Sequence, residues 1–149
     1  MKVVFVVPGP PQGKGRPIFS SYGGRVSART PEKTVEYERL VRTMYQKASP
    51  GRRFPDGAML DLRVIAFYAI PASVSQKRRR AMIAGEVRPT KTPDADNILK
   101  AVADSLNKIA YHDDSQVVDT QIRKFYSGRP RLEITIQETG GGGHEQLTL

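Results

Sequence analysis

Cysteine and tryptophan are absent from this 149-residue chain, and histidine occurs only twice. The absence of cysteine excludes disulfide bridges and thiolate metal sites. Long hydrophobic runs are also missing, because the apolar run of residues 3–7 ends at Pro8. Such a run is too short for a secretion signal or a membrane span. We therefore expect a cytoplasmic protein with no membrane partner.

The length and composition are typical of one domain with its own hydrophobic core. Apolar residues make up only 38% of the chain and the mean hydropathy is −0.46, so much of the sequence must be surface or loop. No internal repeat marks a second domain. We expect one domain over residues 1–139 and a flexible tail over residues 140–149, which opens with four glycines and contains His144. His144 is accordingly interpreted as unstructured and not as a ligand.

Positive charge dominates the chain, with 24 Lys and Arg against 15 Asp and Glu and a formal net charge of +9. This excess favours a nucleic-acid partner, although basic proteins also bind membranes and acidic partners. The distribution is uneven. Residues 2–53 hold eleven basic residues against three acidic ones, whereas residues 94–119 hold six acidic residues against two basic ones, a net −4. An acidic cluster in a cationic protein suggests metal ions that act on a polyanion.

The hydrophobic pattern predicts a domain that contains both strands and helices. Strands are expected over residues 1–7, 58–69, 117–126 and 131–138, and helices over residues 30–48, 75–84 and 96–109. The first strand is continuous and β-branched, which predicts burial on both faces. The last two strands are expected to pair as a hairpin across a turn at residues 127–130. Thr30 is the expected N-cap of the first helix, and Gly85 the expected stop of the second.

Residues 8–29 are predicted to form a long basic loop, whose cations include Lys14, Arg16 and Arg25. Its Gly-Pro-Pro-Gln-Gly-Lys run resembles a phosphate-binding loop only superficially. Gly9 and Gly13 enclose three residues, where the Walker pattern has four, and Gly15 stands in place of its Ser or Thr. We therefore expect no nucleotide cofactor. The loop is either a flexible arm that contacts a phosphate backbone or a surface loop without a role.

A second basic cluster lies within the predicted helix of residues 75–84. Its members are Lys77, Arg78, Arg79 and Arg80. The cluster is either a patch that contacts phosphates or a solvated helix face.

The acidic stretch contains the third predicted helix. Apolar residues at spacings of three and four form one stripe, made of Leu99, Val102, Leu106 and Ile109. Asp96, Lys100 and Asp104 share a face roughly opposite that stripe. Asp94 stands at the entrance of the helix, and Asp113 and Asp114 follow in a short turn.

Structural roles also account for each of these acidic residues. Asp94 or Asp96 can cap the helix. Asp96 and Asp104 can form i,i+4 ion pairs with Lys100, worth about 0.3–0.5 kcal/mol each. Asp113 and Asp114 can be turn residues.

The chemical interpretation is a magnesium site. Mg²⁺ prefers hard oxygen ligands and keeps several waters, so two or three carboxylates suffice. Zinc is not expected, because cysteine is absent and only His112 lies nearby. Bound Mg²⁺ can activate water and offset the charge that develops on a phosphodiester. Lys100, one turn from the carboxylates, can stabilise the transition state electrostatically.

These residues carry a family resemblance. The pattern D-x-D-N-x-x-K-x-x-x-D-x-L, followed by D-D-x-Q, resembles the RusA family of Holliday junction resolvases, small endonucleases of bacteria and their prophages. The matching residues are Asp94, Asp96, Asn97, Lys100, Asp104, Leu106, Asp113, Asp114 and Gln116. The similarity covers most of the chain and is specific over residues 92–138.

The resemblance implies a single-domain RusA-like α/β (α+β) fold in which helices flank a mixed sheet. It also implies a homodimer that binds branched DNA and makes paired symmetric nicks. It implies that Asp94, Asp96 and Asp114 bind Mg²⁺, for which Mn²⁺ is a plausible substitute. Lys100 would be the catalytic lysine, and Asp113 would support the site together with Asn97 and Asp104.

The sequence therefore predicts a Mg²⁺-dependent endonuclease that resolves four-way junctions in DNA recombination and repair. Two symmetric cuts need two sites, and one candidate site per chain then requires a two-fold dimer. The alternatives are a non-catalytic DNA-binding protein with structural carboxylates and a nuclease that prefers flaps or forks. The endonuclease hypothesis has a geometric consequence, since Asp94, Asp96 and Asp114 should converge beside Lys100.

Overall fold

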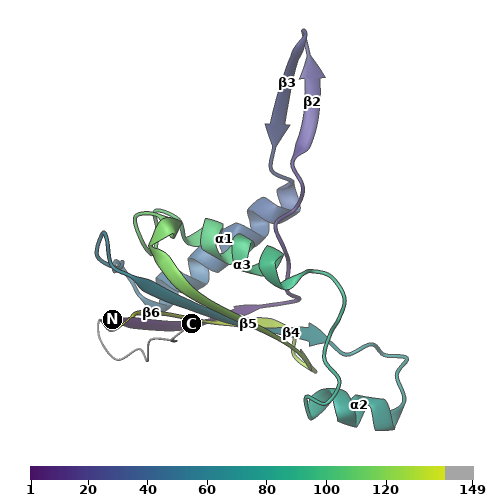
Figure 1. Cartoon of the computed structure of the whole chain (residues 1–149). Coiled ribbons are helices and arrows are strands. Elements are labelled where there is room, and N and C mark those ends of the chain that lie inside the picture. The colour runs from purple at the N-terminus through teal and green to yellow at the C-terminus, as the bar shows by residue number, and fades with distance from the viewer. Residues whose placement is uncertain (140–149) are drawn as a thin grey trace, which may run out of the picture.

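A four-stranded mixed sheet, covered on one face by two helices, forms the body of the protein (Figure 1). The computed structural model describes residues 1–139, so the predicted tail of residues 140–149, with His144, lies outside the described residues. The elements in chain order are β1 (Lys2–Pro8), β2 (Ile18–Tyr22), β3 (Arg25–Arg29), α1 (Glu32–Ala48), β4 (Leu60–Ala69), α2 (Gln76–Ile83), α3 (Ala95–Leu106), the 3₁₀ turn η1 (Asp114–Gln116), β5 (Val117–Ser127) and β6 (Arg131–Glu138). None of the helices within residues 1–139 is long and apolar enough to span a bilayer.

The strand order of the sheet is β1-β6-β4-β5. β6 is antiparallel to both of its neighbours, and β4 is parallel to β5. The predicted hairpin of the last two strands is therefore wrong, because β4 lies between them. Alternation along a strand defines the face that is buried but not the neighbouring strand. β4 has buried residues along most of its length, which suits it to an interior position of the sheet.

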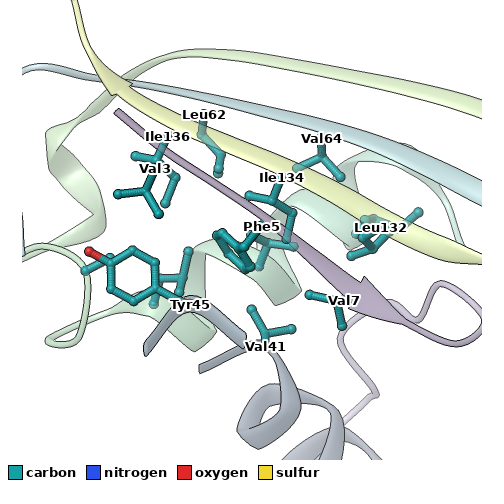
Figure 2. Packing of buried hydrophobic residues seen from close by; sticks show 14 of the residues in the cluster. Val3, Phe5, Val7, Val41, Tyr45, Leu62, Val64, Leu132, Ile134 and Ile136 are labelled. Atoms are coloured by element: carbon teal, nitrogen blue, oxygen red, sulfur yellow. The ribbon is translucent and has the colours of Figure 1, made fainter. Parts of the chain in front are cut away.

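The core lies between the sheet and helices α1 and α3. β1 buries alternate side chains, and these meet α1, where the rings of Phe5 and Tyr45 pack edge to face at 5.7 Å (Figure 2). The residues of β1 on the other face, Val4 and Val6, are 58% and 40% exposed. The predicted burial of this strand on both faces is therefore wrong. The reason is that α1 and α3 cover only one face of the sheet and β1 lies at its edge.

A second, two-stranded sheet replaces part of the predicted loop of residues 8–29. β2 and β3 pair antiparallel around a two-residue turn, in which Gly23 and Gly24 have φ values of +59° and +79°. Positive φ at both central positions suits the turn that matches the twist of a hairpin, and glycine adopts it without strain. The hairpin projects away from the body (Figure 1).

The helix boundaries confirm part of the sequence analysis. Ser75 caps α2 by accepting a hydrogen bond from the Arg78 amide at 3.2 Å, and Gly85 follows with a φ of +79°. The predicted Thr30 cap is wrong, because Pro31 occupies the N-cap position of α1. Thr30 instead follows directly after β3, and the hydroxyl that accepts a bond near this end of α1 belongs to Thr34.

Candidate active site

Helix α3 presents the candidate catalytic residues. Its buried side consists of Ile98, Ala101, Val102, Ser105 and Leu106. Two members of the predicted apolar stripe, Leu99 and Ile109, are only half-buried. The helix ends at Leu106, because Lys108 adopts a φ of +68° that a helix cannot contain. The opposite side, with Asp96 and Lys100, is exposed as predicted.

The carboxylate of Asp94 is not used as a helix cap. Asp94 occupies the N-cap position of α3, and its carbonyl accepts a hydrogen bond from the Ile98 amide at 3.0 Å. Its side chain makes no capping hydrogen bond. Asp94 is exposed, and so is Asp96 in the first turn of the helix. Both carboxylates are therefore available to a ligand at the start of α3.

The predicted ion pairs along α3 do not form. Within residues 1–139, Lys100 has no carboxylate within ion-pair distance, and Asp104 is 3.1 Å from the ammonium of Lys14 instead. The structural interpretation of Asp96, Lys100 and Asp104 as i,i+4 pairs is therefore wrong. Lys100 keeps an exposed cationic head one turn after Asp96.

Lys14 clamps the N-terminal loop to both helices. Its ammonium lies 2.9 Å from Glu38 of α1 in addition to its contact with Asp104 of α3. Burial lowers the pKa of Lys14, but the hydrogen bonds to Glu38 and Asp104 outweigh this effect, so its pKa is raised and it stays cationic. Lys14 is thus held in an ion triad, and its predicted contact with DNA stays a prediction.

Asn97 fixes the same loop beside the two carboxylates. Its side-chain amide donates to the Lys14 carbonyl at 3.1 Å, and the Lys14 amide donates to the Asn97 carbonyl. Gly13 approaches so closely that an added Cβ would lie 2.4 Å from Nδ2 of Asn97. This part of the loop is therefore packed onto α3 and is not the free arm that the sequence suggested.

Asp113 and Asp114 have different roles in the turn after α3. Asp113 forms a capping box with Gln116 at the start of η1, and a hydrogen bond from Ser115 lowers the pKa of its carboxyl. The turn interpretation is therefore confirmed for Asp113. Asp114 is half-buried, and burial raises the pKa of its carboxyl, as do the nearby charges of Asp113 and Asp104. A cation near Asp114 would relieve this repulsion.

Tyr68 is a neighbour of the site that sequence reasoning missed. Its hydroxyl donates to the carbonyl of Pro93, immediately before Asp94. Burial, together with the charge of Asp94, raises the pKa of Tyr68 to about 12. The sequence offers no sign of this contact beyond the position of Tyr68 near the end of a predicted strand. Asp94 and Asn97 also line a cleft of about 420 Å³ between the N-terminal loop and the first turn of α1.

The donor chemistry of this region fits Mg²⁺, since all the available side-chain ligands are carboxylate oxygens. Within residues 1–139, however, no three Asp, Glu or His side chains are grouped closely enough to hold one ion. The expected convergence of Asp94, Asp96 and Asp114 is therefore not present in this arrangement. Mg²⁺ commonly binds one or two carboxylates and completes its shell with water and substrate phosphates.

The other predicted DNA-binding residues lie on the surface. Arg16 precedes β2 and Arg25 begins β3, and both are exposed. The four basic residues of α2 are exposed as well, on a helix that lies apart from α1 and α3 (Figure 1). The structure adds two arginines that the sequence analysis did not single out. Arg88 and Arg131 lie 4.2 Å and 4.0 Å from the ring centroids of Phe125 and Phe67.

Comparison of the sequence with known protein families gives a match that covers most of the chain. The family model described as Endodeoxyribonuclease RusA matches residues 8–137. This match includes all of α3 and η1, and the chain therefore belongs to the RusA endodeoxyribonuclease family. The family resemblance that the sequence motif predicted is confirmed.

Two relatives show how far this similarity extends. The Bacillus subtilis (strain 168) protein named Uncharacterized protein YqaN is 38% identical over 138 residues, which cover 91% of this chain and 96% of that protein. The Lactococcus phage r1t protein named Crossover junction endodeoxyribonuclease rusA is 33% identical over 99 residues, which cover 66% of this chain and 69% of that protein.

Proposed function

We propose that this RusA-family protein is a Mg²⁺-dependent endonuclease that resolves four-way DNA junctions by paired nicks. The observation that carries the proposal is that the charged side chains in the first two turns of α3 are exposed and, within the described residues, not engaged with other side chains. Asp94 and Asp96 are exposed, the Asp94 side chain makes no capping bond, and Lys100 has no ion-pair partner within residues 1–139. The similarity to a phage protein named as a crossover junction endodeoxyribonuclease supports the choice of substrate.

Asp94 and Asp96 would hold the metal ion together with water and a substrate phosphate, and Asp114 would join them only if binding brings η1 closer to the start of α3. Mn²⁺ is expected to substitute for Mg²⁺. Bound Mg²⁺ would supply a Lewis acid that activates water and offsets charge on the phosphodiester. Asp114 contributes a carboxylate whose negative charge is poorly balanced, which favours binding of a cation there. The side chain of Asn97 holds the N-terminal loop against α3 by its hydrogen bond to the Lys14 carbonyl. The ion pair between Lys14 and Asp104 holds the same loop beside the site.

Lys100 would act on the substrate phosphate. Its exposed ammonium, one turn from Asp96, can lie against a non-bridging oxygen and stabilise the negative charge that grows in the transition state. In this role Lys100 serves as an electrostatic group and not as the general base.

The proposed substrate also implies the assembly. A four-way junction is resolved by two symmetric cuts, and residues 1–139 of this chain offer one candidate site. We therefore propose a two-fold homodimer in which each protomer cuts one strand. We also propose a cytoplasmic location, where such a DNA substrate would be met.

The test is a cleavage panel that compares a four-way junction, a fork and a linear duplex, each with Mg²⁺ or EDTA. We expect the wild-type protein to cut the junction in Mg²⁺ only. Asp96→Asn should bind the junction but cut it roughly 100-fold more slowly, because one metal ligand is lost. Asp119→Asn is the matched control, since Asp119 is an exposed acid of the same stretch on β5.

Three outcomes would change the proposal. Absence of cleavage on every substrate in Mg²⁺ would favour the alternative of a non-catalytic DNA-binding protein. Faster cleavage of the fork than of the junction would favour a nuclease of different preference. Cleavage by Asp96→Asn at the wild-type rate would remove the metal-site assignment.

A further inference from the structure

The hairpin of β2 and β3 has two chemically different faces. Directly paired residues of an antiparallel ladder share a face. One face therefore carries the pairs Tyr22–Arg25, Ser20–Ser27 and Ile18–Arg29, and the other carries Ser21–Val26 and Phe19–Ala28. The first face holds two guanidinium groups, two hydroxyls that hydrogen-bond at 2.9 Å, and the ring of Tyr22. This face is cationic, with the aromatic ring of Tyr22 at the tip of the hairpin and the apolar side chain of Ile18 at its base.

The hairpin gives no structural support to the rest of residues 1–139. All ten of its strand residues are exposed, and the Tyr22 side chain is 93% exposed. An aromatic ring in water at the tip of a projecting arm has no packing role in the folded chain. Ile18, Phe19 and Val26 of the same hairpin are also exposed, and exposed apolar side chains gathered on one projecting element indicate a site for a partner.

The charge of the hairpin selects the kind of partner. Residues 16–31 contain three arginines and no Asp or Glu. A polyanion complements this surface, whereas a second copy of the hairpin carries the same positive charge and would be repelled by it. Stacking of an unpaired base on an exposed aromatic ring is favourable and independent of sequence, and arginines beside the ring can hold the flanking phosphates.

The base of the hairpin is attached to the candidate active site. The Gly15 amide donates to the Thr34 hydroxyl at 3.1 Å, and one residue earlier Lys14 is bonded to Asn97. Asn97 directly follows Asp96, so the arm begins next to the exposed carboxylates. Five residues per strand give the arm a reach of about 17 Å. A strand held at Asp94 and Asp96 would therefore pass within reach of the Tyr22 face.

We propose that the hairpin recognises branched DNA by stacking Tyr22 on a base that is unstacked at the branch point, while Arg25 and Arg29 contact the adjacent phosphates. The hairpin would then be the element that distinguishes a junction from a duplex, because an intact duplex offers no unstacked base. This inference deepens the proposed function and rests on it for the position of the cut strand.

The experiment measures DNA binding by fluorescence anisotropy in EDTA, where cleavage is blocked, with a four-way junction and a linear duplex of equal length. Tyr22→Ala should weaken junction binding by about 10-fold, which is about 1.4 kcal/mol, because the base loses the aromatic ring on which it stacks. Binding to the duplex should change by less than about 2-fold. Tyr22→Phe keeps the ring and should bind like the wild-type protein.

Phe19→Ala is the matched control, because Phe19 is an exposed aromatic residue on the opposite face of the same hairpin. It should leave junction binding unchanged. Equal losses from Tyr22→Ala and Phe19→Ala, or an equal loss on junction and duplex, would overturn the proposal. A third outcome would also overturn the proposal: Phe19→Ala lowers the mass measured by sedimentation, and Tyr22→Ala leaves DNA binding unchanged. The hairpin would then contact a second copy of the chain and not DNA.

A Mg²⁺ cleavage assay of the wild-type protein separates the two proposals. Tyr22-dependent binding without any cleavage would remove the nuclease assignment and keep the hairpin as a branch-binding element. Junction cleavage that Tyr22→Ala leaves unchanged, together with unchanged binding, would remove the hairpin proposal and keep the nuclease assignment.

Discussion

The ammonium of Lys14 lies 3.1 Å from the carboxylate of Asp104, across 90 residues of sequence, and 2.9 Å from that of Glu38. This triad joins the N-terminal loop to α1 and α3. It therefore fixes the position of the base of the β2–β3 hairpin relative to α3. The loop that carries the hairpin and the helix that carries the candidate carboxylates should therefore respond together to a change at Lys14.

Lys14→Met should destabilise the fold. It removes the cation from between two carboxylates whose side chains are 15% and 28% exposed, and leaves them to repel each other. The expected loss in free energy of unfolding is about 1–2 kcal/mol, measured by urea denaturation. Arg53→Met is the control, because the Arg53–Asp56 pair is exposed and should contribute nothing measurable. Equal midpoints for the two variants would contradict a structural role of the triad.

Gly13→Ala should disturb the site through its neighbour. The new methyl group would lie 2.4 Å from Nδ2 of Asn97, so the bond from Asn97 to the Lys14 carbonyl must lengthen or break. We expect a loss of stability of about 1–2 kcal/mol and slower junction cleavage. Gly128→Ala is the control, since Gly128 has no atom within 4 Å of the added carbon. Unchanged stability and cleavage in Gly13→Ala would show that the contact is dispensable.

Part of this arrangement could be predicted from sequence, because it depends on local pattern. The alternation of side chains predicts the strand β4, and Gly85 predicts the end of α2. The acidic motif predicted both the family and the exposed side of α3. Each of these features is determined by residues that lie a few positions apart.

The remainder depends on contacts between distant residues. β4 lies between β5 and β6 in the sheet. The alternation of side chains predicts which face of a strand is buried, but it does not predict which strand lies next to it. The bond between Asn97 and Lys14 joins residues that are 83 positions apart. The hairpin could have been found locally, because Gly23-Gly24 is a two-residue turn signal, but the prolines and glycines around it favoured a loop.

Asp114→Asn should raise the thermal stability of the protein and abolish its cleavage activity. The charges of Asp113 and Asp104, and partial burial, disfavour the charged form of Asp114 and raise the pKa of its carboxyl. A raised pKa in the fold means that the ionised group destabilises the protein above that pKa, so the neutral amide should raise Tm in EDTA at neutral pH. Junction cleavage should be lost. Mg²⁺ should raise the Tm of the wild-type protein more than that of the variant, and equal shifts would argue against a metal at Asp114.

Lys100→Met should slow cleavage by roughly 100-fold without changing stability, because its ammonium acts on the developing charge of the phosphate. Lys100 makes no ion pair within residues 1–139, so its loss leaves no unbalanced partner there. Lys100→Arg should retain part of the cleavage rate, since the guanidinium keeps the positive charge but differs from the ammonium in shape. The control is Lys47→Met, an exposed lysine in the last turn of α1. A similar small effect of both Met variants on single-turnover cleavage would exclude a catalytic role for Lys100.

The double variant Arg79→Gln, Arg80→Gln tests whether α2 contacts phosphates or is only solvated. Both side chains are exposed, and α2 buries only Met82 among its residues, so the fold should tolerate the change. If each arginine neutralises one phosphate, the slope of log affinity against log salt concentration should fall by about 2. Junction and duplex binding should weaken by the same factor, because phosphates are common to both. This uniform loss would contrast with the junction-specific loss expected of Tyr22→Ala. An unchanged salt slope would assign α2 to solvent, and a loss confined to the junction would move branch recognition from the hairpin to α2.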